Sequence, residues 1–375
     1  MDAVGRIRFD CRHFAGERPC NFHKASGVKC WSCVHYDPIS SNILVIKLGA
    51  TGDVLRTTSI LRGLKEKFGG AHITWITKRE SLSLFEGNPF VDRVLEHNAA
   101  SYAEIQLREF DLVISLDTSP ESAQVATLAK AKRKIGFGYH PKGHVYPFNK
   151  EAEEWFLMGI DDDLKKRNKK TYQEIISKMC GLEKEHGHPV FNLYTEEIAF
   201  GEEFARKSCI NNRYPIIGLN TGAGSRWEKK KWTQDGFLEL IRTLHREMNA
   251  TILLYGGPLE RQRNQFLLEN SSNQVLDTGL NNSIREFASL IRLCDLLVTA
   301  DTLALHIAVA LGKKVVALFG PTSSHEIDLC GLGEKLSADH LDCLCCYKQK
   351  CDRKPDCMES ITPGMVIEAV RKLLS

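Results

Sequence analysis

The fold of this chain is decided by one stretch, Ile43-Leu44-Val45-Ile46-Lys47-Leu48-Gly49-Ala50-Thr51-Gly52-Asp53-Val54-Leu55-Arg56-Thr57-Thr58. Its first four residues are apolar and mostly β-branched, which predicts a strand buried on both faces, as in a parallel sheet. Two glycines three positions apart follow, and Asp53 then opens a predicted helix. A strand, a glycine-rich turn and a helix in this order let backbone N–H groups approach an anion or a sugar hydroxyl closely.

Asp53 distinguishes this loop from most loops that bind phosphate. A carboxylate at the mouth of the helix would repel a phosphate, so the position predicts a base beside a neutral substrate that carries hydroxyl groups. The alternative is that Asp53 is the N-cap of the helix, with its side chain accepting hydrogen bonds from backbone N–H groups. The loop alone leaves both interpretations open.

Apolar strands alternate with helical patterns around this stretch, in two blocks of similar size. The first block runs from residue 43 to about residue 160, and the second from residue 216 to residue 319. Such alternation is typical of parallel sheets with helices on both faces. We therefore predict an α/β fold with two doubly wound, Rossmann-like domains that face each other across a cleft. Chemistry is expected at the carboxyl ends of the strands.

The expected domain boundaries follow from these blocks. A cysteine-rich extension over residues 1–41 precedes a first domain over 42–195 and a second over 196–340. Residues 341–375 form a second cysteine-rich segment and a final helix, predicted over 365–374, which we expect to pack back on the first domain.

Composition excludes several classes of protein. Of the 375 residues, 43% are hydrophobic and 26% charged, which is ordinary for a globular protein. The net charge of +3 is too small to indicate a nucleic-acid binder. No apolar run approaches the roughly 18 residues of a membrane span. The first eight residues lack the apolar core of a signal peptide, so we expect a cytoplasmic protein.

Nine of the 13 cysteines fall in the two terminal segments. In a reducing compartment, clustered cysteines indicate a metal before they indicate disulfides. The C-x₂-C spacing of Cys30 and Cys33 suits two ligands of one tetrahedral ion. We expect structural zinc, with iron as the alternative; a single site shared by both ends of the chain, or disulfides formed after lysis, stay open. The candidate ligands are Cys11, Cys20, Cys30, Cys33, Cys343, Cys346, Cys351 and Cys357.

Three loops of the second block carry candidate functional groups. Asn220-Thr221-Gly222-Ala223-Gly224-Ser225 leads into the basic run Arg226-Trp227-Glu228-Lys229-Lys230-Lys231-Trp232, which is either a solvated face or a phosphate site. In Tyr255-Gly256-Gly257-Pro258-Leu259-Glu260, the glycines permit close backbone approach and Glu260 could accept from ribose hydroxyls. In the third loop, Asp301 and Thr302 open a helix whose first turn is a preset anion site. The alternatives are Asp301 as an N-cap and His306 as a core histidine.

Taken together, these motifs resemble glycosyltransferase family 9, the bacterial ADP-heptose:lipopolysaccharide heptosyltransferases. The similarity covers about residues 42–335 and includes Phe110-Asp111-Leu112-Val113-Ile114-Ser115-Leu116-Asp117 beside the loops quoted above. The resemblance implies the GT-B fold, with the acceptor bound mainly by the first domain and the nucleotide sugar by the second.

The resemblance also implies roles for single residues. Asp53 matches the general base, Lys230 the lysine at the donor phosphate, and Glu260 the acidic residue near the ribose. Asp301 and Thr302 match the motif at the pyrophosphate and the transferred sugar. Gly257 belongs to the donor side by the same comparison, and the acceptor side comprises Gly49, Gly52 and Thr57. No catalytic metal is expected.

The implied function is an inverting transfer of heptose from ADP-heptose to a lipopolysaccharide-core or related glycan, with peripheral contact to the inner membrane. Two alternatives stay open. Some relatives that carry a cysteine metal finger glycosylate proteins, which would make a protein the acceptor. The chain could instead be a catalytically silent docking protein that binds a nucleotide sugar. Leu303 replaces the glycine that many members have after the Asp-Thr pair, so the donor sugar is open.

Overall fold

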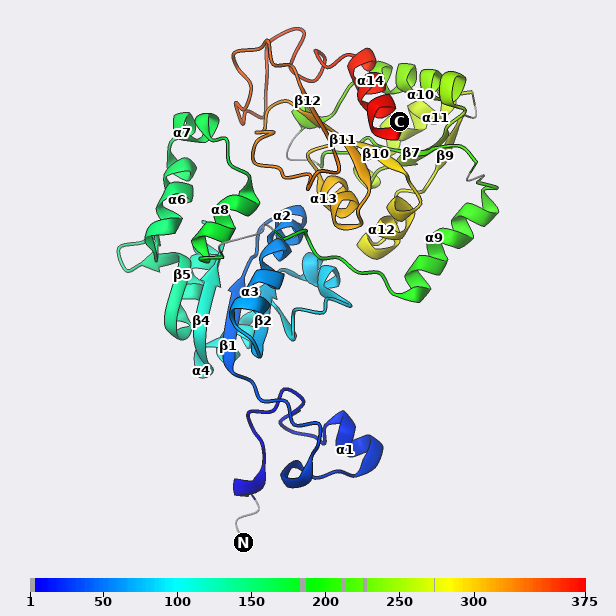
Figure 1. The fold of residues 1–375 in the computed structure, drawn as a ribbon. Coiled ribbons are helices and arrows are strands. Elements are labelled where there is room, and N and C mark those ends of the chain that lie inside the picture. The colour runs from blue at the N-terminus through cyan, green and yellow to red at the C-terminus, as the bar shows by residue number, and fades with distance from the viewer. Residues whose placement is uncertain (1–3, 183–186, 211–212, 225–227, 273) are drawn as a thin grey trace.

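The computed structural model describes residues 4–182, 187–210, 213–224, 228–272 and 274–375. They form two six-stranded sheets, each covered by helices, with a small N-terminal segment that projects from the end of the first sheet (Figure 1). The expected architecture of two Rossmann-like domains is confirmed. Among the described residues, no helix is both long and apolar enough to cross a bilayer.

The first sheet has the strand order β3-β2-β1-β4-β5-β6. The strands from β1 to β5 pair in parallel, and β6 pairs antiparallel with β5. Ile43, Leu44, Val45 and Ile46 of the central strand have no exposed surface, as their apolar run predicts. The strands are β1 (Ser41–Ile46), β2 (Ala71–Thr77), β3 (Arg93–Glu96), β4 (Glu109–Ser115), β5 (Lys130–His140) and β6 (His144–Pro147).

The helix predicted after the first glycine-rich turn is interrupted. It consists of α2 (Thr51–Thr57), the 3₁₀ turn η3 (Thr58–Ile60) and α3 (Leu61–Lys67). Helix α5 (Pro120–Leu128) follows β4. Ser119 caps it, Pro120 stands in its first turn, and β5 already begins at residue 130. The remaining helices of this domain are α4 (Ala99–Leu107), α6 (Glu153–Ile160), α7 (Asp162–Arg167) and α8 (Tyr172–Met179).

The second sheet is parallel throughout, in the order β12-β11-β10-β7-β8-β9. Five of its strands match the predicted apolar runs. The sixth, β12, carries no fully buried residue, so its sequence lacks the apolar run on which strand prediction rests. The strands are β7 (Ile216–Asn220), β8 (Thr251–Tyr255), β9 (Val275–Asp277), β10 (Leu296–Ala300), β11 (Lys314–Phe319) and β12 (Gly333–Ser337).

The last helix packs on the second domain, so the prediction that it returns to the first domain is wrong. Helix α14 (Pro363–Leu374) contacts α10, β11 and β12, and Val366 and Val370 are buried in the core of that domain. Its apolar face is therefore satisfied beside its own sheet. The other helices of the second half are α9 (Thr195–Lys207), α10 (Gln234–Met248), α11 (Arg261–Asn270), α12 (Ile284–Arg292) and α13 (Leu303–Ala310).

The two domains meet where α2 of the first packs against α13 of the second (Figure 1). Gly52 lies at this contact, and a Cβ atom placed on it would be 2.9 Å from Cδ2 of His306. A larger residue would push the two helices apart. Gly52 thus allows the glycine-rich turn of the first domain to approach the Asp-Thr helix of the second.

Candidate active site

A pocket of about 700 Å³ lies between the domains, at the carboxyl ends of the central strands of both sheets. This is where doubly wound sheets bind their ligands. The first domain contributes the turn after β1, and the second contributes the loops after β7, β8 and β10. Seven of the predicted residues line this one pocket: Gly52, Asp53, Lys230, Gly257, Glu260, Asp301 and Thr302.

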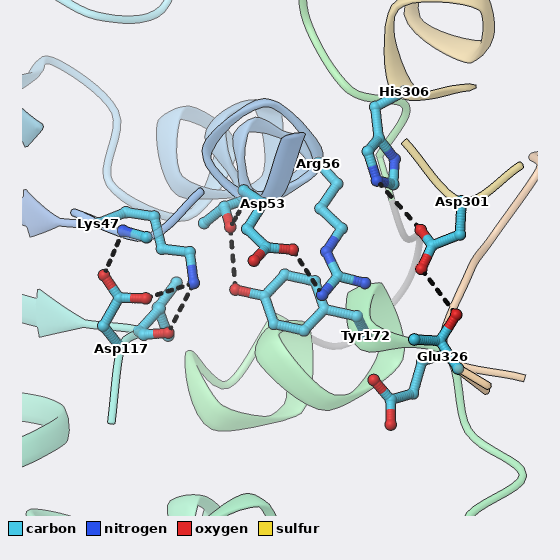
Figure 2. Close-up of polar contacts among 12 residues, drawn as sticks. Lys47, Asp53, Arg56, Asp117, Tyr172, Asp301, His306 and Glu326 are labelled. Carbon is cyan, nitrogen blue, oxygen red and sulfur yellow. Dashed lines mark hydrogen bonds and ion pairs between the residues drawn. The ribbon is translucent and has the colours of Figure 1, made fainter. Parts of the chain in front are cut away.

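Asp53 lies in the first turn of α2 and forms an ion pair with Arg56 (Figure 2). The N-cap of α2 is Ala50, so the alternative in which Asp53 is the N-cap is wrong. The closest side-chain atoms of Asp53 and Arg56 are 2.8 Å apart, and the guanidinium lies over the ring of Tyr172, 4.1 Å from its centroid. The carboxylate therefore faces the pocket with its charge balanced by a neighbouring cation.

The surroundings of Asp53 keep it ionised. Burial alone would raise the pKa of this carboxyl, but the positive charges of Arg56 and Lys47 outweigh burial and lower its pKa to about 2. The side chain is consequently a carboxylate throughout the neutral pH range. It can accept a hydrogen bond or a proton from a ligand without first having to lose a proton.

A buried ion pair holds the turn that carries Asp53. Lys47 donates to Oδ1 of Asp117 over 2.5 Å, and both side chains are almost fully buried. The other oxygen, Oδ2, accepts from the backbone N–H groups of Leu48 and Gly49 and from the hydroxyl of Ser122. Burial opposes the charge of Lys47, but Asp117 outweighs burial and raises the Lys47 pKa. Asp117, at the end of β4, thus fixes the turn at the end of β1.

Two residues predicted on the acceptor side support this turn instead of lining the pocket. Gly49 donates its N–H to Asp117 over 3.0 Å. Thr57 is fully buried, donates its hydroxyl to the backbone carbonyl of Asp53 and lies 2.9 Å from the hydroxyl of Tyr172. Both residues therefore position α2, and only Gly52 of the three faces the pocket.

Lys230 and Asp301 form the opposite wall. The ammonium group of Lys230 donates to Oδ2 of Asp301 over 2.6 Å, and Thr322 donates to the same oxygen over 3.0 Å. Burial would raise the Asp301 pKa, but the charge of Lys230 outweighs burial and lowers it. The N-cap of α13 is Thr302, so Asp301 is not the N-cap. Its carboxylate instead accepts the hydrogen bond from Lys230. This pair places a cation beside the first turn of α13.

His306 stands between the two walls (Figure 2). Its Nε2 is 4.0 Å from Oδ1 of Asp301, and the ring lines the pocket. Burial lowers the His306 pKa to about 4, and Arg56 acts in the same direction. The ring is therefore neutral at physiological pH. The ring is almost fully buried, as in the alternative of a core histidine, but it also lines the pocket.

The two carboxylate oxygens of Glu260 have different surroundings. Oε2 accepts from the N–H of Gly257 over 3.0 Å, which fixes the side chain. Oε1 is buried, and among the described residues it has no hydrogen-bond partner, although the Lys231 ammonium lies 3.5 Å away. A buried acceptor of this kind usually has a partner, so a hydroxyl group of a ligand fits here.

The basic loop is anchored by its second tryptophan. Trp232 is buried and donates its indole N–H to the carbonyl of Ile361 over 2.8 Å. Trp232 therefore packs the loop against the C-terminal part of the chain. The first tryptophan of the predicted pattern, Trp227, lies outside the described residues.

Sequence inspection missed a group of residues from the C-terminal cysteine-rich segment and its surroundings. Tyr347 lines the pocket and donates its hydroxyl to Glu326 over 3.0 Å. The ammonium nitrogen Nζ of Lys165, on α7 of the first domain, lies 3.6 Å from the centroid of the Tyr347 ring. The segment after β12 therefore reaches back to close one side of the pocket.

The cysteines of this segment do not form a preformed metal site in the described part of the chain. Burial raises the Cys357 pKa to about 11. Negative charge on Asp356, Cys346 and Cys351 raises it further, by smaller amounts. In the described part of the chain, no three His, Cys, Asp or Glu side chains converge closely enough to hold a metal ion. Metal binding by Cys343, Cys346, Cys351 and Cys357 therefore stays a prediction.

Residues 101–357 match the family model described as glycosyltransferase family 9 (heptosyltransferase). The matched region covers more than half of the chain and contains the loops that carry Lys230, Glu260 and Asp301. The chain belongs to glycosyltransferase family 9. It is therefore a glycosyltransferase, and the pocket between its domains is the place for its chemistry.

Individual proteins of this family are similar to the chain at low sequence identity. Lipooligosaccharide heptosyltransferase 2 of Campylobacter jejuni (strain 81116) is 24% identical over 334 residues, which cover 86% of this chain and 96% of the relative. Two solved structures share the fold. A family 9 glycosyl transferase from Veillonella parvula aligns with a TM-score of 0.71 at 20% identity, over 89% of this chain and 97% of its own. ADP-heptose lps heptosyltransferase II of E. coli aligns with a TM-score of 0.64 at 20% identity, over 89% of this chain and 98% of its own.

Proposed function

We propose that this glycosyltransferase moves heptose from ADP-heptose to a lipopolysaccharide-core acceptor, with inversion at the anomeric carbon. The observation that carries the proposal is the single pocket in which Asp53 of the first domain faces the Lys230–Asp301 pair of the second. The names of the relatives, lipooligosaccharide and lipopolysaccharide heptosyltransferases, support the donor and the acceptor class.

On the acceptor side, Asp53 accepts the proton of the attacking hydroxyl. Its low pKa makes it a weak base toward a free alcohol. As the new bond to an oxocarbenium-like carbon forms, however, the hydroxyl becomes strongly acidic, so a fixed carboxylate suffices to remove the proton. The Lys47–Asp117 pair contributes by holding the turn in place.

On the donor side, two positive groups stabilise the departing diphosphate. Lys230 supplies a cation, and the N–H groups at the start of α13 supply the positive end of a helix. Oε1 of Glu260, which has no hydrogen-bond partner among the described residues, accepts from a ribose hydroxyl. Leu303 lines the same pocket at the position where many family members have glycine, so its side chain shapes the space for the sugar.

A transfer assay tests the function. Purified protein is incubated with lipopolysaccharide cores truncated before each heptose and with ADP-heptose, ADP-glucose or UDP-glucose as donor. We expect a mass increase of one heptose on one truncated core with ADP-heptose only. Transfer from a UDP-sugar, or no transfer to any truncated core, would contradict the proposal. Transfer to a protein added in place of the core would favour the alternative acceptor.

Arg56 provides a test through pH, because its charge helps to keep the Asp53 pKa low. A carboxyl with a lowered pKa is active above that pKa, so the wild-type kcat/KM should show no acid limb from Asp53 above about pH 4. Arg56→Met removes the largest of the lowering charges, so the acid limb should move upward by about one pH unit or more. The pH profile of kcat/KM between pH 4 and 9 measures this shift.

Arg62→Met is the matched control, because Arg62 is an exposed arginine on the neighbouring helix α3. It should leave the pH profile unchanged. An Arg56→Met profile that superimposes on the wild-type profile would show that Asp53 does not titrate in the reaction.

We also propose peripheral contact with the membrane that carries the acceptor. Leu157 and Ile160 of α6 are 45% and 70% exposed, and the last turn of α7 beside them is basic. Because Lys165 of α7 also lines the pocket, this surface lies next to the site of transfer. Wild-type protein should cosediment with vesicles containing anionic lipid, and Ile160→Asp should reduce the bound fraction several-fold. Equal binding of both proteins would contradict this contact.

A further inference from the structure

The N-terminal segment, residues 4–40, is described in full but has no core of its own. None of these residues is buried, and its only regular elements are η1 (Val4–Arg6), α1 (Asn21–Ser26) and η2 (Cys30–Ser32). Figure 1 shows it projecting from the first domain, away from the second. A segment of this size that buries no apolar side chain needs a disulfide or a metal to hold its shape.

All four cysteines of the segment line one pocket of about 210 Å³. They reach it from separate turns of the chain. Cys11 pairs with Pro38 in an isolated antiparallel bridge, Cys20 precedes α1, and Cys30 and Cys33 stand at the two ends of η2. None of the four is in a disulfide. The fold of the segment thus gathers four free thiols around one space.

The other groups around this pocket suit thiolate ligands. His23 has its Nδ1 2.9 Å from the carbonyl oxygen of Val28, so Nδ1 carries the proton and fixes the ring. Two basic residues, Arg8 and Arg18, also line the pocket. A divalent ion held by four thiolates has a net charge of about −2, which two nearby cations offset.

We propose that Cys11, Cys20, Cys30 and Cys33 bind one structural metal ion, with zinc preferred over iron. The pocket is wider than an ion, and no three potential ligands among the described residues already converge. Binding therefore draws the four thiols inward, and each thiol releases its proton as it becomes a ligand. Metal binding and ordering of the segment are one coupled step.

Arg12, next to Cys11, connects this segment to the first domain. Its guanidinium donates to the carbonyls of Gly70 and Ala71 and pairs with Asp37 and Asp92. Gly70 and Ala71 lie at the amino end of β2, opposite to the end that forms the active pocket. The ion thus organises a module on the far end of the sheet, and its loss should leave the active pocket intact.

The test compares metal content in full-length proteins purified under reducing conditions without chelator or polyhistidine tag. The variants are Cys30→Ser and, as the matched control, Cys209→Ser, which removes an exposed thiol outside both clusters. We expect Cys30→Ser to contain about one equivalent of zinc plus iron less than wild type, and Cys209→Ser to match wild type. The difference between proteins isolates this site from any metal at the C-terminal cysteines.

A second measurement keeps the test decisive if Cys30→Ser folds poorly. Metal-stripped wild-type protein is titrated with Co²⁺, and thiolate-to-cobalt absorption should appear together with protection of residues 4–40 from proteolysis. Equal metal content in wild type and Cys30→Ser would overturn the proposal. So would a Cys30–Cys33 disulfide found by mass spectrometry in protein prepared anaerobically under reducing conditions.

Discussion

Asp53→Asn is expected to lower turnover by roughly 10²–10⁴, the usual contribution of a positioned general base. The substitution keeps the size and shape of the side chain but removes the negative charge that accepts the proton. The substituted amide would still lie beside Arg56, so α2 and the domain contact should persist. Steady-state rates with saturating donor and acceptor measure the effect, and thermal unfolding checks that the fold is intact.

Glu66→Gln is the control, because Glu66 is an exposed carboxylate on α3 outside the pocket. It should retain wild-type turnover. If Asp53→Asn keeps more than about half of the wild-type rate, the carboxylate is not the base. The role of Asp53 would then be to hold Arg56 in place. Arg56→Met would in that case lower turnover by the same small factor as Asp53→Asn.

Lys230→Ala is expected to weaken ADP binding by about 10- to 100-fold, the range of a charge-assisted hydrogen bond to phosphate. The loss has two causes, since the cation disappears and the carboxylate of Asp301 remains in the pocket without its lysine. Calorimetry with ADP, GDP and UDP measures both the loss and the preference for adenine. Asp301→Ala should also weaken ADP binding, because Asp301 positions the lysine.

Two matched variants define what would contradict this assignment. Lys229→Ala removes the neighbouring cation, which pairs with Asp356 and does not line the pocket, and should leave ADP affinity unchanged. Asp53→Asn should change it by less than about twofold, because Asp53 belongs to the acceptor side. Equal losses in Lys229→Ala and Lys230→Ala, or a preference for UDP, would refute the donor site.

Most of the fold could be predicted because the strands are buried on both faces. Residues 43–46 and 216–219 are short apolar runs bounded by turns, and such runs identify parallel strands without tertiary information. The same reasoning fails for β12, whose residues are only partly buried, and for α14, whose apolar stripe does not say which sheet it covers. Periodicity reports that a face is buried but not by which partner.

The candidate site shows the same division. Asp53, Lys230, Glu260 and Asp301 follow strand ends, so the rule that ligands bind there brought them together. Tyr347 could not be found in this way, because it comes from an irregular segment that only the three-dimensional fold returns to the pocket. Asp117 does follow a strand, β4, but its partner Lys47 becomes apparent only when the two strands are seen to be neighbours.

The most direct test of the account is the anomeric configuration of the transferred heptose, determined by NMR on the product. In a single displacement, the acceptor hydroxyl that Asp53 deprotonates attacks the anomeric carbon from the face opposite to the leaving ADP. The account therefore predicts a product of inverted configuration relative to the donor. A product that retains the donor configuration would contradict the assignment of Asp53 as the base in a direct transfer.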